Sequence, residues 1–167
     1  MGVAETGPVR LVEEYGPAWS PGPFERGTDG PRVILVGVDS SPTALRAGAY
    51  AAGLARRQHS RLVVVYVATP GPWTGMMPGV YAAQEQMFDQ VIEDLRRLIQ
   101  EGADEVGVPI MFMVRQGDPF VELRQAATEI RADMVVVGSS EHRGRRFIGS
   151  VATRLVRAGR WPVTVVP

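Results

Sequence analysis

The sequence predicts an α/β domain: a single doubly wound, five-stranded parallel sheet with helices on both faces. Short apolar runs of strand length alternate along the chain with amphipathic segments of helix length. This alternation is typical of parallel sheets with right-handed crossovers. The chain has 167 residues, 45% hydrophobic and 22% charged, which is the size and composition of one globular domain.

Each expected strand is a nearly continuous apolar run, as found in strands that are buried on both faces. In chain order the runs are Arg32–Val38, Arg61–Val67, Pro109–Arg115, Met134–Gly138 and Trp161–Val166. From these runs alone the strand order stays open, because two doubly wound orders suit five strands.

The expected helices follow from capping residues and apolar spacing. Ser41 is the expected N-cap of the first helix, with Pro42 in its first turn, and Asp118 with Pro119 opens the third helix in the same way. In the second helix, apolar residues recur at three- and four-residue spacing. The predicted helices are about Pro42–Arg57, Tyr81–Glu101, Phe120–Ile130 and Gly149–Gly159.

Residues 1–30 are expected to form an irregular leader, and residues 31–167 the α/β domain. Gly16-Pro17 and other Gly/Pro pairs in the leader are typical of turns and linkers, and its scattered apolar residues leave open whether it docks on the domain or on a partner. The stretch Ala68–Val80 is expected to be a long loop of the kind that carries function or forms a lid.

Charge and composition exclude several function classes. The formal net charge is zero, so no basic field attracts nucleic acid or an anionic membrane. The apolar stretches are too short to span a bilayer. The chain has no cysteine, which fits a reducing compartment such as the cytoplasm. It also has no lysine, which excludes a Walker-type phosphate loop.

Two strand ends form the candidate binding site. Asp39 ends the first strand and Gly138 ends the fourth, and both face one crevice if these strands are neighbours. After Gly138 come a polar loop, Ser139–Ile148, and the helix start at Gly149 and Ser150. Free N–H groups at a helix start form an anion site. The alternatives are that Asp39 only caps a turn and that Ser150 only caps the helix.

From Arg32 to Pro167 the pattern resembles the universal stress protein family. The resemblance depends on Val36-Gly-Val-Asp39 followed by Ser-Ser-Pro, Gly117-Asp118-Pro119, Val-Val-Val-Gly138, Gly149-Ser150-Val151 and the closing Trp161-Pro-Val-Thr-Val-Val. It implies the strand order 3-2-1-4-5, which places the first and fourth strands side by side. It also implies homodimers that pair through the last strand, here Trp161–Val166. Some members bind ATP, and most are regulators.

The resemblance implies a set of nucleotide-binding residues, although the phosphate loop departs from the family's motif. Carried over are Asp39 and Val67 on the adenine and ribose side, and Val137, Gly138, Gly149, Ser150 and Val151 on the phosphate side. Glu141 stands where the ATP-binding branch has a second glycine, and seven residues instead of nine separate it from Gly149. A carboxylate there would repel a triphosphate. Arg143, Arg145 and Arg146 either offset that repulsion or form a solvated face.

The chain is therefore expected to be a cytoplasmic, homodimeric regulator that senses a nucleotide or another small ligand during stress. The loop departures favour loss of ATP binding over its retention, and Mg²⁺ is expected only together with ATP. One alternative is a dimeric interaction module that does not bind ATP, and another is a slow ATP hydrolase. His59 and His142 lack metal-ligand spacing, so neither a metal site nor a catalytic residue is assigned.

Overall fold

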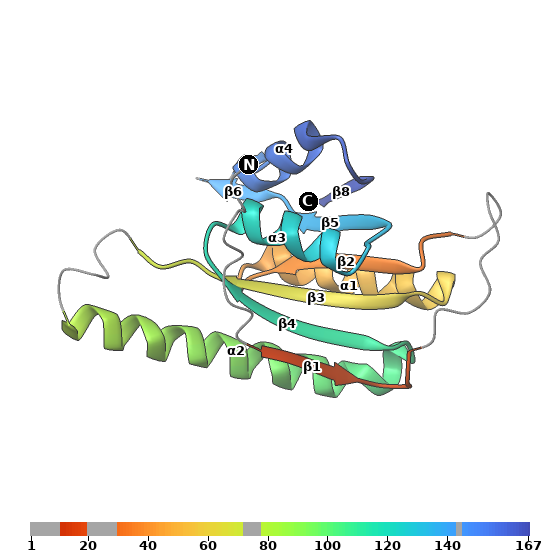
Figure 1. Ribbon diagram of the computed structural model, residues 1–167, viewed down its shortest axis with the longest axis horizontal. Helices are drawn as coiled ribbons and strands as arrows, with labels where there is room; N and C mark the ends of the chain where they lie inside the picture. Colours follow the sequence, from red (N-terminus) through yellow and green to blue (C-terminus); the bar gives the residue numbers. More distant parts are fainter. Residues whose placement is uncertain (1–10, 20–29, 72–77, 143–144) are drawn as a thin grey trace.

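The computed structural model describes residues 11–19, 30–71, 78–142 and 145–167, and it has the layered α/β architecture expected from the sequence (Figure 1). The strands are β1 (Leu11–Tyr15), β2 (Val33–Val38), β3 (Arg61–Ala68), β4 (Ile110–Gln116), β5 (Met134–Gly138), β6 (Ser140–His142), β7 (Arg145–Phe147) and β8 (Val163–Val166). The helices are α1 (Pro42–Gln58), α2 (Pro78–Val106), α3 (Pro119–Glu129) and α4 (Ser150–Ala158).

The main sheet has the strand order β1-β4-β3-β2-β5-β8. Its parallel part, from β4 to β8, is the order 3-2-1-4-5 of the expected strands, so the predicted doubly wound topology is confirmed. The sheet has one strand more than the expected five, because β1 adds an antiparallel strand beside β4.

Two apolar clusters lie on opposite faces of this sheet. On one face, alternate residues of the central strands, such as Ile34 and Val36, pack against α1 and α2. On the other face, the intervening residues, such as Leu35, pack against α3 and α4. The α1 helix lies close to the sheet because its buried positions include four alanines: Ala44, Ala47, Ala51 and Ala55.

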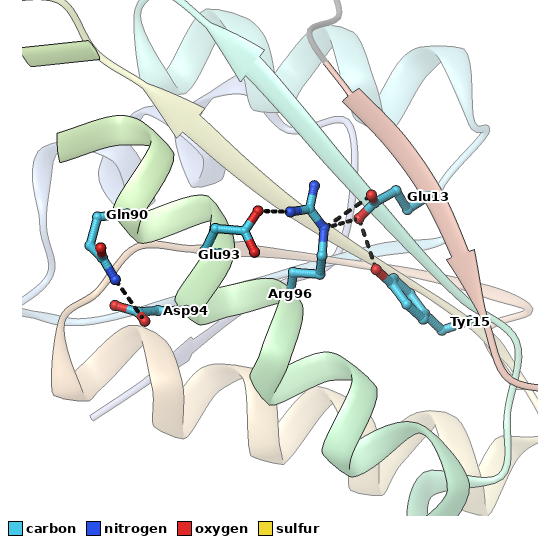
Figure 2. Close-up of polar contacts among 6 residues, drawn as sticks. All are labelled: Glu13, Tyr15, Gln90, Glu93, Asp94 and Arg96. Carbon is cyan, nitrogen blue, oxygen red and sulfur yellow. Dashed lines mark hydrogen bonds and ion pairs between the residues drawn. The ribbon is translucent and has the colours of Figure 1, made fainter. Parts of the chain in front are cut away.

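The prediction of an irregular leader is wrong for β1, where an edge strand pairs along β4 and lies near α2 (Figure 1). The strand alternates, with Leu11, Glu13 and Tyr15 half-buried and the residues between them exposed. Figure 2 shows how it is fastened: Arg96 Nε of α2 donates to the two carboxylate oxygens of Glu13 at 3.0 and 2.8 Å. The Tyr15 hydroxyl donates to Glu13 at 2.8 Å.

The Glu13 carboxylate gives β1 a pH dependence. The hydrogen bond from Arg96 is the largest cause that lowers the pKa of Glu13 below its ordinary value, although partial burial opposes it. Because the folded pKa is lowered, the stabilisation is present at neutral pH and is lost as the pH falls through the folded pKa. We expect Glu13→Gln to cost about 1 kcal/mol or less at pH 7.

Urea unfolding at pH 7 and at about pH 3, below the ordinary pKa of a glutamate, measures this effect. The destabilisation by Glu13→Gln should shrink at the lower pH. Glu14→Gln is the matched control on the same strand, because Glu14 is 64% exposed in its ion pair with Arg61 and should contribute less. A cost for Glu13→Gln that is equal at both pH values would contradict the assignment.

Other boundaries differ from the expectations. The helix predicted at about Tyr81–Glu101 is longer in the structure, where α2 spans Pro78–Val106, and β8 begins at Val163 rather than Trp161. The polar loop after Gly138 contains a short hairpin, β6–β7. Residues 72–77 of the expected loop at 68–80 lie outside the described residues. Within the described part of the chain, no helix has both the length and the apolar character needed to cross a bilayer.

Candidate functional site

A cavity of about 720 Å³ lies at the carboxyl edge of the parallel sheet, where β2 and β5 are neighbours. Doubly wound sheets bind ligands at this position, because the strand order reverses there, and the volume suits a small organic ligand. The structure brings all the predicted site residues to its wall: Asp39, Val67, Val137, Gly138, Gly149, Ser150 and Val151. Helices on both faces of the sheet complete the wall, with Phe88 from α2 and Leu123 from α3.

Asp39 is exposed at the end of β2, and its carboxylate also organises the turn into α1. Its Oδ1 accepts a hydrogen bond from the Ser41 N–H at 2.8 Å. Ser41 is the N-cap of α1, as predicted, and its Oγ accepts from the Ala44 N–H at 3.2 Å. The turn-capping role, given above as the alternative for Asp39, is therefore present in the structure, and Asp39 also lines the cavity.

Gly138 allows the end of β5 to approach the backbone of α1. A Cβ at this position would lie 2.7–2.8 Å from backbone atoms of Thr43 and Ala44. Such distances are too short for any side chain, so the close packing of β5 on α1 requires a glycine. This packing places the first turn of α1 directly beside the strand end and so shapes one wall of the cavity.

The N-terminus of α4 also lies at the cavity, and it has no side-chain cap. Its N-cap residue is Gly149, and among the described residues no side chain accepts a hydrogen bond there. Ser150 is exposed in the first turn, so the alternative that Ser150 caps this helix is wrong. The helix dipole and the first N–H groups of α4 therefore face the cavity without a side-chain acceptor.

Sequence reasoning missed Ser139, although it directly follows Gly138. Ser139 lines the cavity and is only 8% exposed, and its buried Oγ has no hydrogen-bond partner in the described part of the chain. Its backbone N–H already donates to the Val166 carbonyl at 2.7 Å. An unpaired buried hydroxyl costs free energy, so a hydrogen-bond partner for Ser139 Oγ would stabilise this end of the strand. The other missed polar lining residues are Ser41, Thr43, Tyr66, Thr69 and Ser140.

Ser139 and Ser60 should respond in opposite ways to alanine substitution. Ser139→Ala removes an unpaired hydroxyl and should raise the free energy of unfolding of the ligand-free protein by about 1 kcal/mol. Ser60 is fully buried and its Oγ donates to the Pro31 carbonyl, so Ser60→Ala should lower the free energy of unfolding by about 1–3 kcal/mol. Thermal and urea unfolding of the two variants measure the difference. Equal losses in both would mean that Ser139 is already paired.

The segment between Gly138 and Gly149 forms the antiparallel hairpin of β6 and β7. The backbone pairs Ser140 with Phe147, Glu141 with Arg146 and His142 with Arg145. Ser140 lies against the start of α4, since a Cβ at Gly149 would be 3.1 Å from the Ser140 Cβ. The predictions for the side chains of Glu141, Arg145 and Arg146, and for Arg143, fall outside the described parts of the structure.

Arg154 ties α4 to the start of α3. Its Nη1 donates to both carboxylate oxygens of Asp118 at 3.2 and 3.1 Å, and its Cζ lies 4.2 Å from the centroid of the Phe120 ring. Partial burial acts to raise the pKa of Asp118, but hydrogen bonds from the Val121 N–H and Arg154 outweigh it and lower the pKa. Asp118 is also the N-cap of α3, so the contact with Arg154 holds α4 beside the start of α3, whose N-terminus already has a side-chain cap.

The topology and the cavity define an α/β protein with a ligand cleft at the carboxyl ends of its two central strands. Residues 31–167 match the sequence profile of the universal stress protein family, and the chain belongs to that family. A universal stress protein of Methanocaldococcus jannaschii is 26% identical over 138 residues, which are 81% of this chain and 81% of the relative.

Solved structures of family members agree with this assignment. A universal stress family protein from Burkholderia pseudomallei is 32% identical with a TM-score of 0.61, covering 81% of this chain and 96% of its own. A universal stress protein solved in complex with cAMP is 25% identical with a TM-score of 0.62, covering 82% of this chain and 97% of its own. These comparisons cover the α/β domain of the chain.

Proposed function

We propose that this chain is a cytoplasmic regulatory protein whose cleft binds an adenine nucleotide and which acts as a homodimer. One observation carries the proposal: two residues that line the same cavity each offer an unsatisfied polar group. These groups are the uncapped N-terminus of α4 at Gly149 and the unpartnered hydroxyl of Ser139. Both are groups that bind a phosphate oxygen. The similar protein in complex with cAMP supports an adenine nucleotide as the ligand.

The rest of the cavity suits a nucleoside. Asp39 is exposed at the strand end, where an acidic residue accepts a hydrogen bond from a ribose hydroxyl in doubly wound nucleotide sites. Val67 and Thr69 lie at the end of β3, and Phe88 adds an apolar wall from α2. In this arrangement the base lies toward β3, and the phosphate lies toward Ser139 and α4.

Calorimetric titration with AMP and with cAMP tests nucleotide binding, with one site per protomer expected. Gly149→Glu should abolish binding, because it places bulk and a negative charge at the start of α4. Gly102→Glu is the matched control: Gly102 lies in α2, and a Cβ there meets no atom within 4 Å. If neither nucleotide binds the wild-type protein, the nucleotide-binding proposal is rejected. The second candidate function, an interaction module that works without a nucleotide, is then favoured.

The proposed dimer forms through β8. This strand pairs with β5 on one side, and in the described residues no strand pairs with its other edge. Three of its four half-buried residues are valines, and an unpaired strand edge of this kind can pair with the same strand of a second chain. Analytical ultracentrifugation at micromolar concentration should give twice the 18.1 kDa protomer mass. A monomer at that concentration would refute this part of the proposal.

A further inference from the structure

We infer that the groove between α1 and α2 is a docking site for a cationic amphipathic helix of a partner protein, whose apolar anchor residues are flanked by arginine or lysine. The groove has a volume of about 290 Å³ and shares no lining residue with the cavity at the strand ends. It lies on the face of the sheet that α1 and α2 cover (Figure 1). The inference is therefore independent of nucleotide binding. It follows from the exposed apolar side chains, the shape and the charge of this groove.

The groove has exposed apolar side chains on both of its walls. Leu98 of α2 is 52% exposed and Leu45 of α1 is 40% exposed, and both line the groove together with Val91. Met87 lies one turn before Val91 on the same side of α2 and is 69% exposed. Apolar residues that are scattered singly over a surface need no explanation, but apolar residues gathered at one groove indicate a contact surface.

The shape of the groove fits a helix. Its lining residues belong to α1, α2 and the turn before α1, so an extended peptide finds no strand edge there with which to pair. On α1, the small residues Ala49 and Ala52 follow Leu45 on the same side of the helix and keep this wall shallow. A groove between two helices on one sheet face accepts the ridge of side chains of a third helix.

The charge of α2 determines the charge of the partner. The helix contains seven acidic residues and two arginines, a formal net charge of −5, although the chain as a whole is neutral. Both arginines already bind carboxylates: Arg96 binds Glu13 of β1 and Glu93 (Figure 2), and Arg97 binds Asp94. A cationic partner is therefore complementary to α2, whereas an anionic lipid surface would be repelled.

Two carboxylates flank the apolar anchor at the rim of the groove. Asp94 lies one turn before Leu98 and Glu101 one turn after it, and both are exposed and line the groove. Arg97 is 68% exposed, and its ion pair with Asp94 is a surface pair that contributes little stability. A partner's arginine or lysine can therefore bind either carboxylate while an apolar residue of the same helix packs on Leu98.

Fluorescence anisotropy with a labelled amphipathic peptide tests the inference on the nucleotide-free protein at about 0.15 M salt. The peptide is composed of leucine and lysine, with leucine at the spacing of one helix face. We expect saturable binding of this peptide. A peptide with glutamate in place of lysine, and one with the same composition but alternating leucines, should each bind about tenfold more weakly or worse.

Matched variants locate the binding surface. Leu98→Ser should weaken binding of the lysine peptide by about tenfold, whereas Val156→Ser, at a similarly exposed residue of α4 on the other face of the sheet, should not change it. Glu101→Gln should weaken binding by about threefold and reduce its salt dependence. Asp89→Asn should leave it unchanged, because Asp89 lies on the side of α2 that carries Arg96 and faces β1. Circular dichroism checks that each variant is folded.

Several results would overturn the inference. They are no binding of the lysine peptide, equal binding of the glutamate peptide, and unchanged binding by Leu98→Ser. Analytical ultracentrifugation tests a second copy of the chain as the occupant: a smaller assembly for Leu98→Ser than for the wild type would show that the groove is an interface between copies. Flotation with vesicles of anionic phospholipid tests a membrane in the same way, and binding that Leu98→Ser abolishes would assign the groove to lipid.

Discussion

Replacing Arg115 with methionine is expected to lower the free energy of unfolding by about 3–5 kcal/mol. Arg115 on β4 is fully buried, and its Nε donates to Glu122 Oε2 of α3 at 2.7 Å, while its Nη1 donates to Glu129 Oε2 at 2.8 Å. Burial acts to lower the pKa of Arg115, but the hydrogen bonds that Arg115 donates to Glu122 and Glu129 outweigh it and raise the pKa. The methionine variant would leave the Glu122 carboxylate, which is 5% exposed, without its cation.

Two further variants separate the buried pair from its exposed neighbour. Glu129 is 44% exposed, so Glu129→Gln should cost only about 0–1 kcal/mol. The double variant Arg115→Met, Glu122→Met removes both buried charges and should recover much of the stability. Urea unfolding of the three proteins measures these costs. A loss below about 1 kcal/mol for Arg115→Met alone would show that Glu122 finds another partner or takes up a proton.

Gly138→Ala is expected to lower the free energy of unfolding by about 1–3 kcal/mol, although it adds a single methyl group. That methyl group would lie 2.7–2.8 Å from backbone atoms of Thr43 and Ala44, and backbone cannot rotate away as a side chain can. Relief requires β5 and the first turn of α1 to separate. Since both line the cavity, the variant should also weaken nucleotide binding.

Gly102→Ala is the matched control for this substitution. Gly102 lies inside α2, and a Cβ there meets no atom within 4 Å. Alanine is a better helix former than glycine, so this variant should raise the free energy of unfolding by about 0.5–1 kcal/mol. Thermal unfolding of both variants gives the comparison. Opposite signs support a packing role for Gly138, and a stabilising Gly138→Ala would contradict it.

The parallel part of the fold could be predicted because each strand is a continuous apolar run and each helix has its own start signal. Ser41 and Asp118 were predicted as N-caps and are N-caps in the structure. The strand β1 was missed because its alternating pattern, with Glu13 and Glu14 at its centre, resembles polar linker sequence. The main partner of the half-buried Glu13 is the distant Arg96 on α2, and no local pattern reveals that contact.

The cavity wall could be predicted in outline but not in its chemistry. The seven expected residues lie together because β2 and β5 are neighbours, which follows from the strand order. The close approach of Gly138 to α1 and the unpaired Ser139 hydroxyl depend on tertiary contacts between segments far apart in sequence. The hairpin after Ser139 was missed because its three-residue strands are too short to give a periodic signal.

The most direct test of the proposed cleft is an amide NMR titration of the ¹⁵N-labelled protein with AMP. The largest shifts are expected at Ser139, at Gly149–Ala152 and at Asp39, the groups that border the proposed phosphate and ribose positions. Shifts at Val67 and Thr69 should report the base. Shifts confined to the groove between α1 and α2, around Leu45 and Leu98, would contradict this placement of the nucleotide.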